Sequence, residues 1–160
     1  MNTSNKIMSL QDAVREANIW KSKGEKIVFT NGCFDILHLG HVDYLEKASI
    51  LGTKLVIGVN SDASVSDIKG PARPICNEYS RSRVLAALAF VDAVVLFGEP
   101  TPYELITAIM PHILVKGNDY LAENIVGADI VTANGGAVMT IPLVNGYSTT
   151  SIINKILNNK

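Results

Sequence analysis

Two histidines, three positions apart, are the residues whose type and spacing most clearly indicate chemistry. His38 and His41 lie in residues 30–41, TNGCFDILHLGH, and at this spacing they project from the same side of a first helical turn. Gly40 between them leaves room for a phosphate to approach the backbone. Imidazole N–H groups beside a helix start can stabilise negative charge that builds at phosphorus, so we predict a triphosphate-binding site. The alternatives are a capped helix with packed or solvated histidines, and a metal site that lacks a third ligand at a supporting spacing.

A predicted strand and a predicted helix flank this motif. Residues 26–29 are mostly β-branched or aromatic, which predicts a buried parallel strand, and residues 42–48 carry apolar positions at helical spacing. The motif therefore lies where a strand ends and a helix begins, which is where an open α/β sheet binds its ligand.

Strands and helices alternate along the rest of the chain. We predict further strands at residues 55–59, 93–97, 112–115 and 137–143. We predict helices from the cap residue Ser9 to Gly24 and at residues 78–90, 124–134 and 151–157. A further short helix is expected to begin at a Thr101–Glu104 capping box, with Pro102 at the first helical position. Residues 1–8 are expected to be a loose start, and residues 63–77 a long loop that contains glycine and prolines. The alternation predicts an α/β fold, a Rossmann-like doubly wound parallel sheet of five strands.

The whole chain is expected to form one domain, residues 1–160. Within it, residues 1–24 would supply an N-terminal packing helix and residues 26–158 the catalytic core.

Basic side chains recur near the edge where the predicted strands end. Lys69 and Arg73 lie in the long loop and would form either a phosphate clamp or a solvated basic pair. Arg81 and Arg83 lie in the first turns of a predicted helix, where cations oppose the helix dipole unless they contact an anion. Their position therefore favours a ligand at this edge.

Two later segments reach the same edge. Residues 116–120, KGNDY, follow a predicted strand and suit phosphate, close backbone approach and ribose hydroxyls, although a plain turn explains them nearly as well. Residues 147–150, YSTT, open the last predicted helix. Three consecutive hydroxyl residues exceed what one N-cap needs, so a phosphate at this helix start is the alternative to simple capping.

Composition limits the class of protein and its partners. The net charge is −1, which gives no basic field for nucleic acid, and hydrophobic residues make up 48% of the 160 residues. Cys33 and Cys76 match no metal spacing and suit a reducing compartment. No apolar run approaches the roughly 20 residues that span a bilayer, and the N-terminus lacks a signal-peptide core, so we expect a cytoplasmic protein without a membrane partner.

Residues 31–35, NGCFD, with residues 38–41, HLGH, resemble the HxGH signature of the nucleotidyltransferase superfamily of cytidylyltransferases and small adenylyltransferases. The resemblance extends over residues 26–155 and includes Arg81, residues 116–120 and the Ser-Thr-Thr turn. Residues 59–65, 69–74, 115–120, 133–136 and 146–153 are most similar to the adenylyltransferase domain of the bacterial ADP-heptose enzymes. Asn118 departs from that family, which usually has glycine at this position.

The resemblance implies transfer of AMP from ATP to D-glycero-β-D-manno-heptose 1-phosphate, with release of pyrophosphate, for lipopolysaccharide core synthesis. One alternative is glycerol-3-phosphate cytidylyltransferase, whose arginine-threonine pair before the Ser-Thr-Thr turn is replaced here by Leu143 and Val144. An alternative of another class is a nucleotide-binding module without turnover. The adenine or cytosine preference, the acceptor sugar and its anomer stay open.

With the resemblance, the candidate residues divide into three groups. Those expected to act in catalysis stabilise charge or hold phosphates: His38, His41, Lys69 and Arg81. Those expected to bind the nucleotide are Thr30, Asn31, Gly32, Cys33, Phe34, Gly40, His41, Lys116, Gly117, Asp119, Tyr147, Ser148, Thr149 and Thr150. Those expected to bind the acceptor are Asp35, Asn60, Asp62, Lys69 and Arg73.

The expected small-molecule partners are ATP and a sugar phosphate. Mg²⁺ would be held mainly by phosphate oxygens and water, and no protein metal site is expected. The resemblance implies a homodimer, and a separate sugar kinase would have to supply the acceptor.

Overall fold

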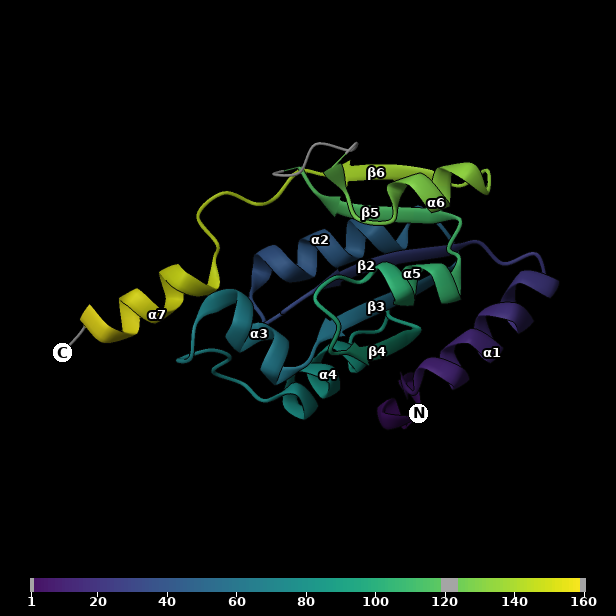
Figure 1. Cartoon of the computed structure of the whole chain (residues 1–160). Helices are drawn as coiled ribbons and strands as arrows, with labels where there is room; N and C mark the ends of the chain where they lie inside the picture. Colours follow the sequence, from purple (N-terminus) through teal and green to yellow (C-terminus); the bar gives the residue numbers. More distant parts are fainter. Residues whose placement is uncertain (1, 119–123, 159–160) are drawn as a thin grey trace.

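The computed structural model of the protein describes residues 2–118 and 124–158. A parallel sheet of six strands runs through it, in the order β1-β4-β3-β2-β5-β6 (Figure 1). The strands are β1 (Ile7–Met8), β2 (Ile27–Gly32), β3 (Lys54–Asn60), β4 (Ala93–Phe97), β5 (Ile113–Gly117) and β6 (Ala137–Ile141). The doubly wound parallel sheet is confirmed, with one strand more than predicted.

The additional strand β1 corrects the prediction of a loose start at residues 1–8. Ile7 and Met8 pair in parallel with Val94 and Val95 of β4, at the edge of the sheet. Two residues are too few to show any periodicity, so only the contact with β4 defines this strand.

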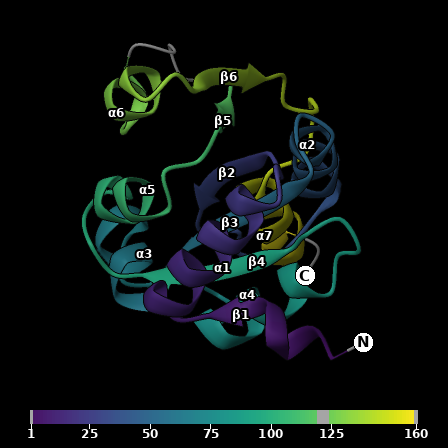
Figure 2. The same cartoon turned by 90° about the vertical axis from the view of Figure 1, so that its right-hand side faces the viewer.

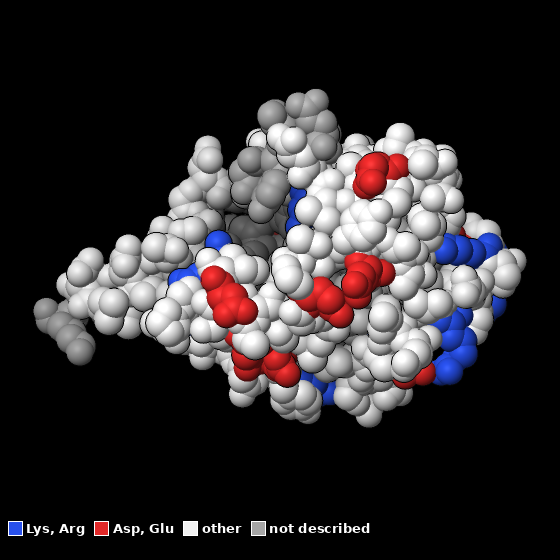
Figure 3. Space-filling model, viewed as in Figure 1, with Lys and Arg blue, Asp and Glu red and all other residues white. Residues whose placement is uncertain are grey.

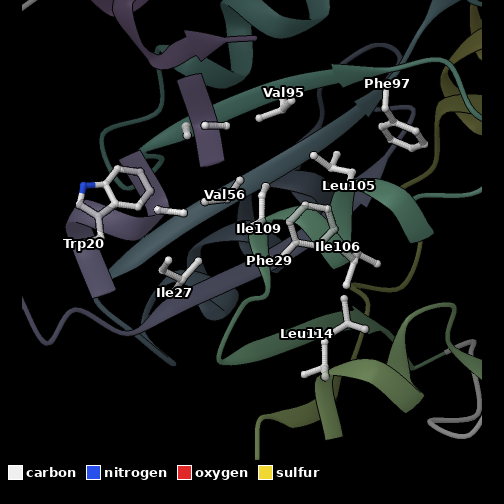
Figure 4. Packing of buried hydrophobic residues seen from close by; sticks show 14 of the residues in the cluster. Trp20, Ile27, Phe29, Val56, Val95, Phe97, Leu105, Ile106, Ile109 and Leu114 are labelled. Carbon is white, nitrogen blue, oxygen red and sulfur yellow. The ribbon is translucent and has the colours of Figure 1, made fainter. Parts of the chain in front are cut away.

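Eight helical segments connect and cover the strands in the described part of the chain. They are the 3-10 turn η1 (Thr3–Lys6), α1 (Leu10–Ser22), α2 (Leu39–Ser49), α3 (Asp62–Lys69), α4 (Glu78–Ala86), α5 (Tyr103–Ile109), α6 (Ala128–Ala133) and α7 (Thr149–Asn158). Helices α1, α5 and α6 pack on one face of the sheet, and α2 and α4 pack on the other (Figure 2). The first of these two layers is shown from close by in Figure 4, where side chains of α1 and α5 meet those of the central strands.

The central strands β2, β3 and β5 are buried on both faces because their side chains alternate between the two layers. Phe29 and Leu114 join the cluster under α1, α5 and α6, whereas their neighbours Val28 and Ile113 join the cluster under α2 and α4. This explains why the strands appear in the sequence as continuous apolar runs.

Several helix starts differ from the prediction: α2 begins at Leu39, α6 at Ala128 and α7 at Thr149, rather than at residues 42, 124 and 151. Helix α3 lies inside the segment predicted as a loop, capped by the Ser61 side chain, which accepts a hydrogen bond from the Ser64 N–H. Helix α5 begins at Tyr103 rather than Pro102, and no side chain caps it, so the predicted Thr101–Glu104 capping box does not form.

The strand order places a switch point between β2 and β5. From β2 the chain adds β3 and then β4 on one side, and then crosses back so that β5 pairs with β2 on the other side. The helix that follows β2, α2, and the helix that follows β5, α6, lie on opposite faces of the sheet. This arrangement opens a crevice at the carboxyl edge, which faces α7 in Figure 1. The predicted motifs at residues 30–41 and 116–120 follow these two strands.

Candidate active site

A cavity of about 610 Å³ opens at this carboxyl edge. Figure 3 shows basic atoms beside the hollow between α7 and the main body of the protein. Seventeen of the predicted site residues line the cavity: Asn31, Gly32, Cys33, Phe34, Asp35, His38, Gly40, His41, Asn60, Lys69, Arg73, Lys116, Gly117, Tyr147, Ser148, Thr149 and Thr150. The fold thus brings together segments that are more than 100 residues apart in sequence.

The two histidines lie at the start of α2 with their rings stacked. The ring centroids of His38 and His41 are 3.8 Å apart at an interplanar angle of 17°, and Phe34 packs its edge against His41 at 5.4 Å. Both Nδ1 atoms are buried without a hydrogen-bond partner among the described residues. Burial, together with the neighbouring His38, lowers the pKa of His41 to about 4, and burial also lowers the pKa of His38. Both imidazoles are therefore neutral near pH 7, and each carries one N–H to donate.

Gly40 is required by the way the histidines pack. A Cβ at this position would lie 3.1 Å from the His38 ring and 3.3 Å from the Cβ of Tyr147. A side chain here would therefore push apart the His38 ring and the segment that leads into α7. The glycine allows the C-terminal segment to close against the histidine motif.

Asp35 lies differently from its prediction as an acceptor ligand, because its carboxylate is already satisfied by the protein. Its side chain is 0% exposed. One oxygen accepts hydrogen bonds from Arg73 Nε at 2.7 Å and the Ile75 N–H at 2.8 Å, and the other accepts from the Cys76 N–H at 2.9 Å. Burial alone would raise the pKa of Asp35, but these three donors hold it below its usual value. Asp35 is therefore an anion that organises the loop between α3 and α4.

Arg81 and Asp62 also lie differently from the prediction, since neither is among the residues that line the cavity. The Arg81 side chain is 1% exposed and donates to the carbonyls of Cys33, Cys76 and Asn60 and to the Asp62 carboxylate. The anion that compensates this cation at the start of α4 is thus a protein carboxylate. Arg81 joins the ends of β2 and β3 to the loop before α4.

Two lysines supply positive charge to the cavity. Lys69, at the end of α3, is exposed and forms no ion pair with any residue in the described ranges. Lys116, near the end of β5, donates to the Asn31 carbonyl at 3.1 Å. The thiol of Cys33 lies near Lys69, but burial raises its pKa, so it stays protonated and is a poor nucleophile.

Of the three hydroxyl residues at the start of α7, two form hydrogen bonds within the protein and one is exposed to the cavity. Thr149 Oγ1 donates to the Asp35 carbonyl at 2.6 Å, and Ser148 Oγ caps α7 by accepting from the Ser151 N–H at 3.0 Å. Thr150 is exposed at the cavity rim. The capping explanation therefore accounts for Ser148, while Thr149 attaches the helix to the histidine loop.

One further predicted residue, Thr30, is not among the described residues that line the cavity. Thr30 is buried, and its hydroxyl shares a 2.7 Å hydrogen bond with that of Tyr44, so it stabilises β2 against α2. Asp119 lies outside the described residues.

Sequence reasoning missed most of the apolar cavity wall. The residues it did not assign to the site are Tyr44, Ile68, Pro100, Thr101, Pro102, Asn124, Ile125, Val126, Leu143 and Val144. Leu143 and Val144 had been noted as the replacements of an arginine-threonine pair, and Thr101 and Pro102 had been assigned to a helix start. Apolar residues near strand ends resemble core residues in sequence, so no chemical pattern marks them.

Within residues 2–118 and 124–158, no group of three His, Cys, Asp or Glu side chains is arranged to hold a metal ion. None of the described helices is long and apolar enough to cross a membrane.

Residues 29–155 match the sequence model of the cytidylyltransferase-like family, and the chain therefore belongs to that family. The chain is 54% identical over 153 residues to the bifunctional protein HldE of Magnetococcus marinus, a match that covers 96% of this chain and 31% of that protein. It is 56% identical over 137 residues to the HldE of Trichlorobacter lovleyi, covering 86% of this chain and 28% of that protein. The chain thus spans less than a third of the length of these relatives.

Two solved structures resemble the fold. The lipopolysaccharide core biosynthesis protein of Thermoplasma volcanium superposes with a TM-score of 0.60 at 29% identity, covering 78% of this chain and 100% of that one. A pantoate-β-alanine ligase of Francisella tularensis superposes with a TM-score of 0.58, covering 95% of this chain and 77% of that one. At 15% identity the ligase supports the fold alone.

Proposed function

We propose that this chain transfers AMP from ATP to D-glycero-β-D-manno-heptose 1-phosphate and releases pyrophosphate. The observation that carries the proposal is the pair of stacked, neutral histidines at a helix start, in a cavity that also holds Lys69, Arg73 and Lys116. Membership of the cytidylyltransferase-like family supports the reaction class. The HldE relatives and the Thermoplasma lipopolysaccharide core protein support the choice of a heptose acceptor.

In this mechanism an oxygen of the sugar phosphate attacks the α-phosphorus of ATP in line with the departing pyrophosphate. The nucleophile is already an anion, so alignment and charge neutralisation supply most of the acceleration rather than a strong base. The N–H groups of His38 and His41 donate to the oxygens on which charge builds. Lys69 and Arg73 neutralise the acceptor phosphate, and the start of α7 receives the β- and γ-phosphates. Mg²⁺ would be held by the phosphate oxygens of ATP and by water, and it would offset part of the negative charge of the triphosphate.

The proposal also covers the source of the acceptor, the oligomeric state and the cellular location. The acceptor is a sugar 1-phosphate, so a kinase reaction must supply it. We include a homodimer and a cytoplasmic location in the proposal as expectations for this family.

The proposal is tested by measuring pyrophosphate release for ATP and CTP, each with heptose 1-phosphate and with glycerol 3-phosphate. Turnover only with ATP and heptose 1-phosphate is the expected result. Turnover with CTP and glycerol 3-phosphate would move the chain to the glycerol-phosphate branch, and Leu143 and Val144 at the cavity wall argue against that outcome. Nucleotide binding without pyrophosphate from any pair would favour a binding module.

A further inference from the structure

Arg73 is held by one end of its guanidinium group. Its Nε donates to Asp35, and neither terminal nitrogen has a partner among the described residues. The side chain is 17% exposed and lines the cavity. A guanidinium presents its two terminal nitrogens as a rigid fork that matches two phosphate oxygens. The arrangement therefore leaves the phosphate-binding end of Arg73 available.

Asp35 fixes this orientation with a carboxylate whose hydrogen-bond partners all belong to the protein. Its two oxygens receive three protein donors, two of them backbone N–H groups of the loop that carries Arg73. A substrate hydroxyl would have to displace one of these donors from a side chain with 0% exposure. The carboxylate thus connects the histidine loop, in which it lies, to the loop between α3 and α4.

The backbone around Asp35 supports the same conclusion. Phe34 and Ile36 both have positive φ angles, 50° and 54°. This region is unfavourable for residues with a side chain, and for a β-branched residue such as Ile36 in particular, so surrounding contacts must maintain it. The contacts that maintain it include the three hydrogen bonds to the Asp35 carboxylate and the one from Thr149 to its carbonyl. The strained turn aims the carboxylate at the Arg73 loop and places the histidines at the start of α2.

We propose that Asp35 is a positioning residue, which holds Arg73 so that its two terminal nitrogens bind the phosphate group of the acceptor. This inference rests on the proposed function for the identity of the acceptor. The acceptor phosphate approaches the negatively charged triphosphate, so it needs a cation in a fixed position. Asp35 offsets the charge of Arg73, and the net positive charge at this end of the cavity comes from Lys69. The contribution of Asp35 is therefore orientation.

The test compares Asp35→Asn, Arg73→Gln and the double variant in steady-state kinetics. Each single change is expected to raise the KM for the sugar phosphate about 10- to 100-fold, the loss typical of a hydrogen bond to a charged group. The Kd for ATP should change less than about twofold. The double variant should be no worse than Arg73→Gln, because Asp35 acts through Arg73.

A matched control pair lies on α1, where Arg15 and Asp12 form an ion pair with 72% and 49% exposed side chains, and neither lines the cavity. Asp12→Asn and Arg15→Gln should leave both constants unchanged. If Asp35→Asn does not fold, Arg73→Lys replaces it in the comparison. A lysine ammonium lacks the rigid fork by which Nε can bind Asp35 while the two terminal nitrogens bind the phosphate, so the KM should still rise about 10-fold.

The inference is overturned if Asp35→Asn lowers kcat while the acceptor KM stays at the wild-type value. It is also overturned if Asp35→Asn raises that KM equally in the wild-type and Arg73→Gln backgrounds.

Failure of the proposed function is a separate result, in which wild-type protein gives no pyrophosphate with heptose 1-phosphate. In that case, inorganic phosphate is titrated into ¹⁵N-labelled protein while the Arg73 Nε–H signal is followed. A shift in the wild type that Asp35→Asn abolishes supports the positioning role, and no shift in the wild type overturns it.

Discussion

At the scale of single residues, the site depends on imidazoles that stay uncharged. His38 and His41 stack at 3.8 Å, neither forms an ion pair with a carboxylate among the described residues, and burial lowers the pKa of both. A neutral imidazole donates one N–H without bringing a full positive charge beside the cations of the cavity. This suits a reaction in which charge moves between phosphate oxygens while the total charge stays constant.

We expect His41→Ala to reduce kcat by about two to three orders of magnitude, which corresponds to about 3–4 kcal/mol for one lost transition-state donor. The variant should bind ATP and unfold at nearly the wild-type denaturant concentration, because the Nδ1 of His41 has no partner among the described residues. Pyrophosphate release and urea unfolding measure the two quantities. A variant that retains near wild-type turnover would show that the histidine is not catalytic.

At the scale of elements, the carboxyl edge is assembled by buried charges that link loops. Asp35 joins the loop after β2 to the loop before α4, and Arg81 joins the ends of β2 and β3 to the same loop. Thr149 then attaches α7, none of whose described residues is buried, to the Asp35 carbonyl. The cavity is therefore shaped by a few polar contacts between loops, whereas the apolar core below it positions the strands.

We expect Arg81→Met to lower the free energy of unfolding by about 1–3 kcal/mol, the usual cost of leaving buried acceptors without their donor. The reason is that three carbonyls and the Asp62 carboxylate lose their common donor. The Asp62 carboxylate is 39% exposed and can be solvated by water, so it adds little to this loss. Arg83→Met, two positions along α4, is the matched control and should change stability little. Urea unfolding of both variants gives the comparison. If Arg81→Met kept wild-type stability and lost only turnover, Arg81 would instead act directly on substrate.

At the scale of the whole molecule, the strand order determines where the site lies. Because β5 returns to pair with β2, the histidine loop and the end of β5 diverge around one crevice. At the opposite edge of the sheet, His112 Nδ1 accepts the Ile27 N–H, and burial with the charges of Lys21 and Lys26 lowers its pKa. Both edges of the sheet therefore contain histidines that are neutral in the folded protein near pH 7.

These histidines predict a loss of stability in mild acid. In the unfolded chain they bind protons near pH 6.5, but the folded protein resists protonation until about pH 4 in the case of His41. The free energy of unfolding is therefore unaffected by these histidines above pH 6.5 and decreases as the pH falls below it. For His41 the decrease reaches up to about 3 kcal/mol. Urea unfolding at about pH 7, 5.5 and 4.5 measures it. His41→Gln should flatten the dependence, and an equally steep curve for that variant would contradict the assignment.

The sequence by itself determined the parallel α/β sheet, the edge that carries the site and most residues of the cavity wall. This was possible because strand runs, helix periodicity and the motif at residues 30–41 are local patterns, and parallel strands bring their carboxyl ends to one edge. The tertiary structure decided that β1 pairs with β4, and that Asp35 and Arg81 face protein partners. Those partners lie far along the chain, such as the 38 residues between Asp35 and Arg73 and the 48 between Cys33 and Arg81. A charged residue has the same appearance in sequence whether it meets a ligand or another loop, and only the packing of the loops distinguishes the two.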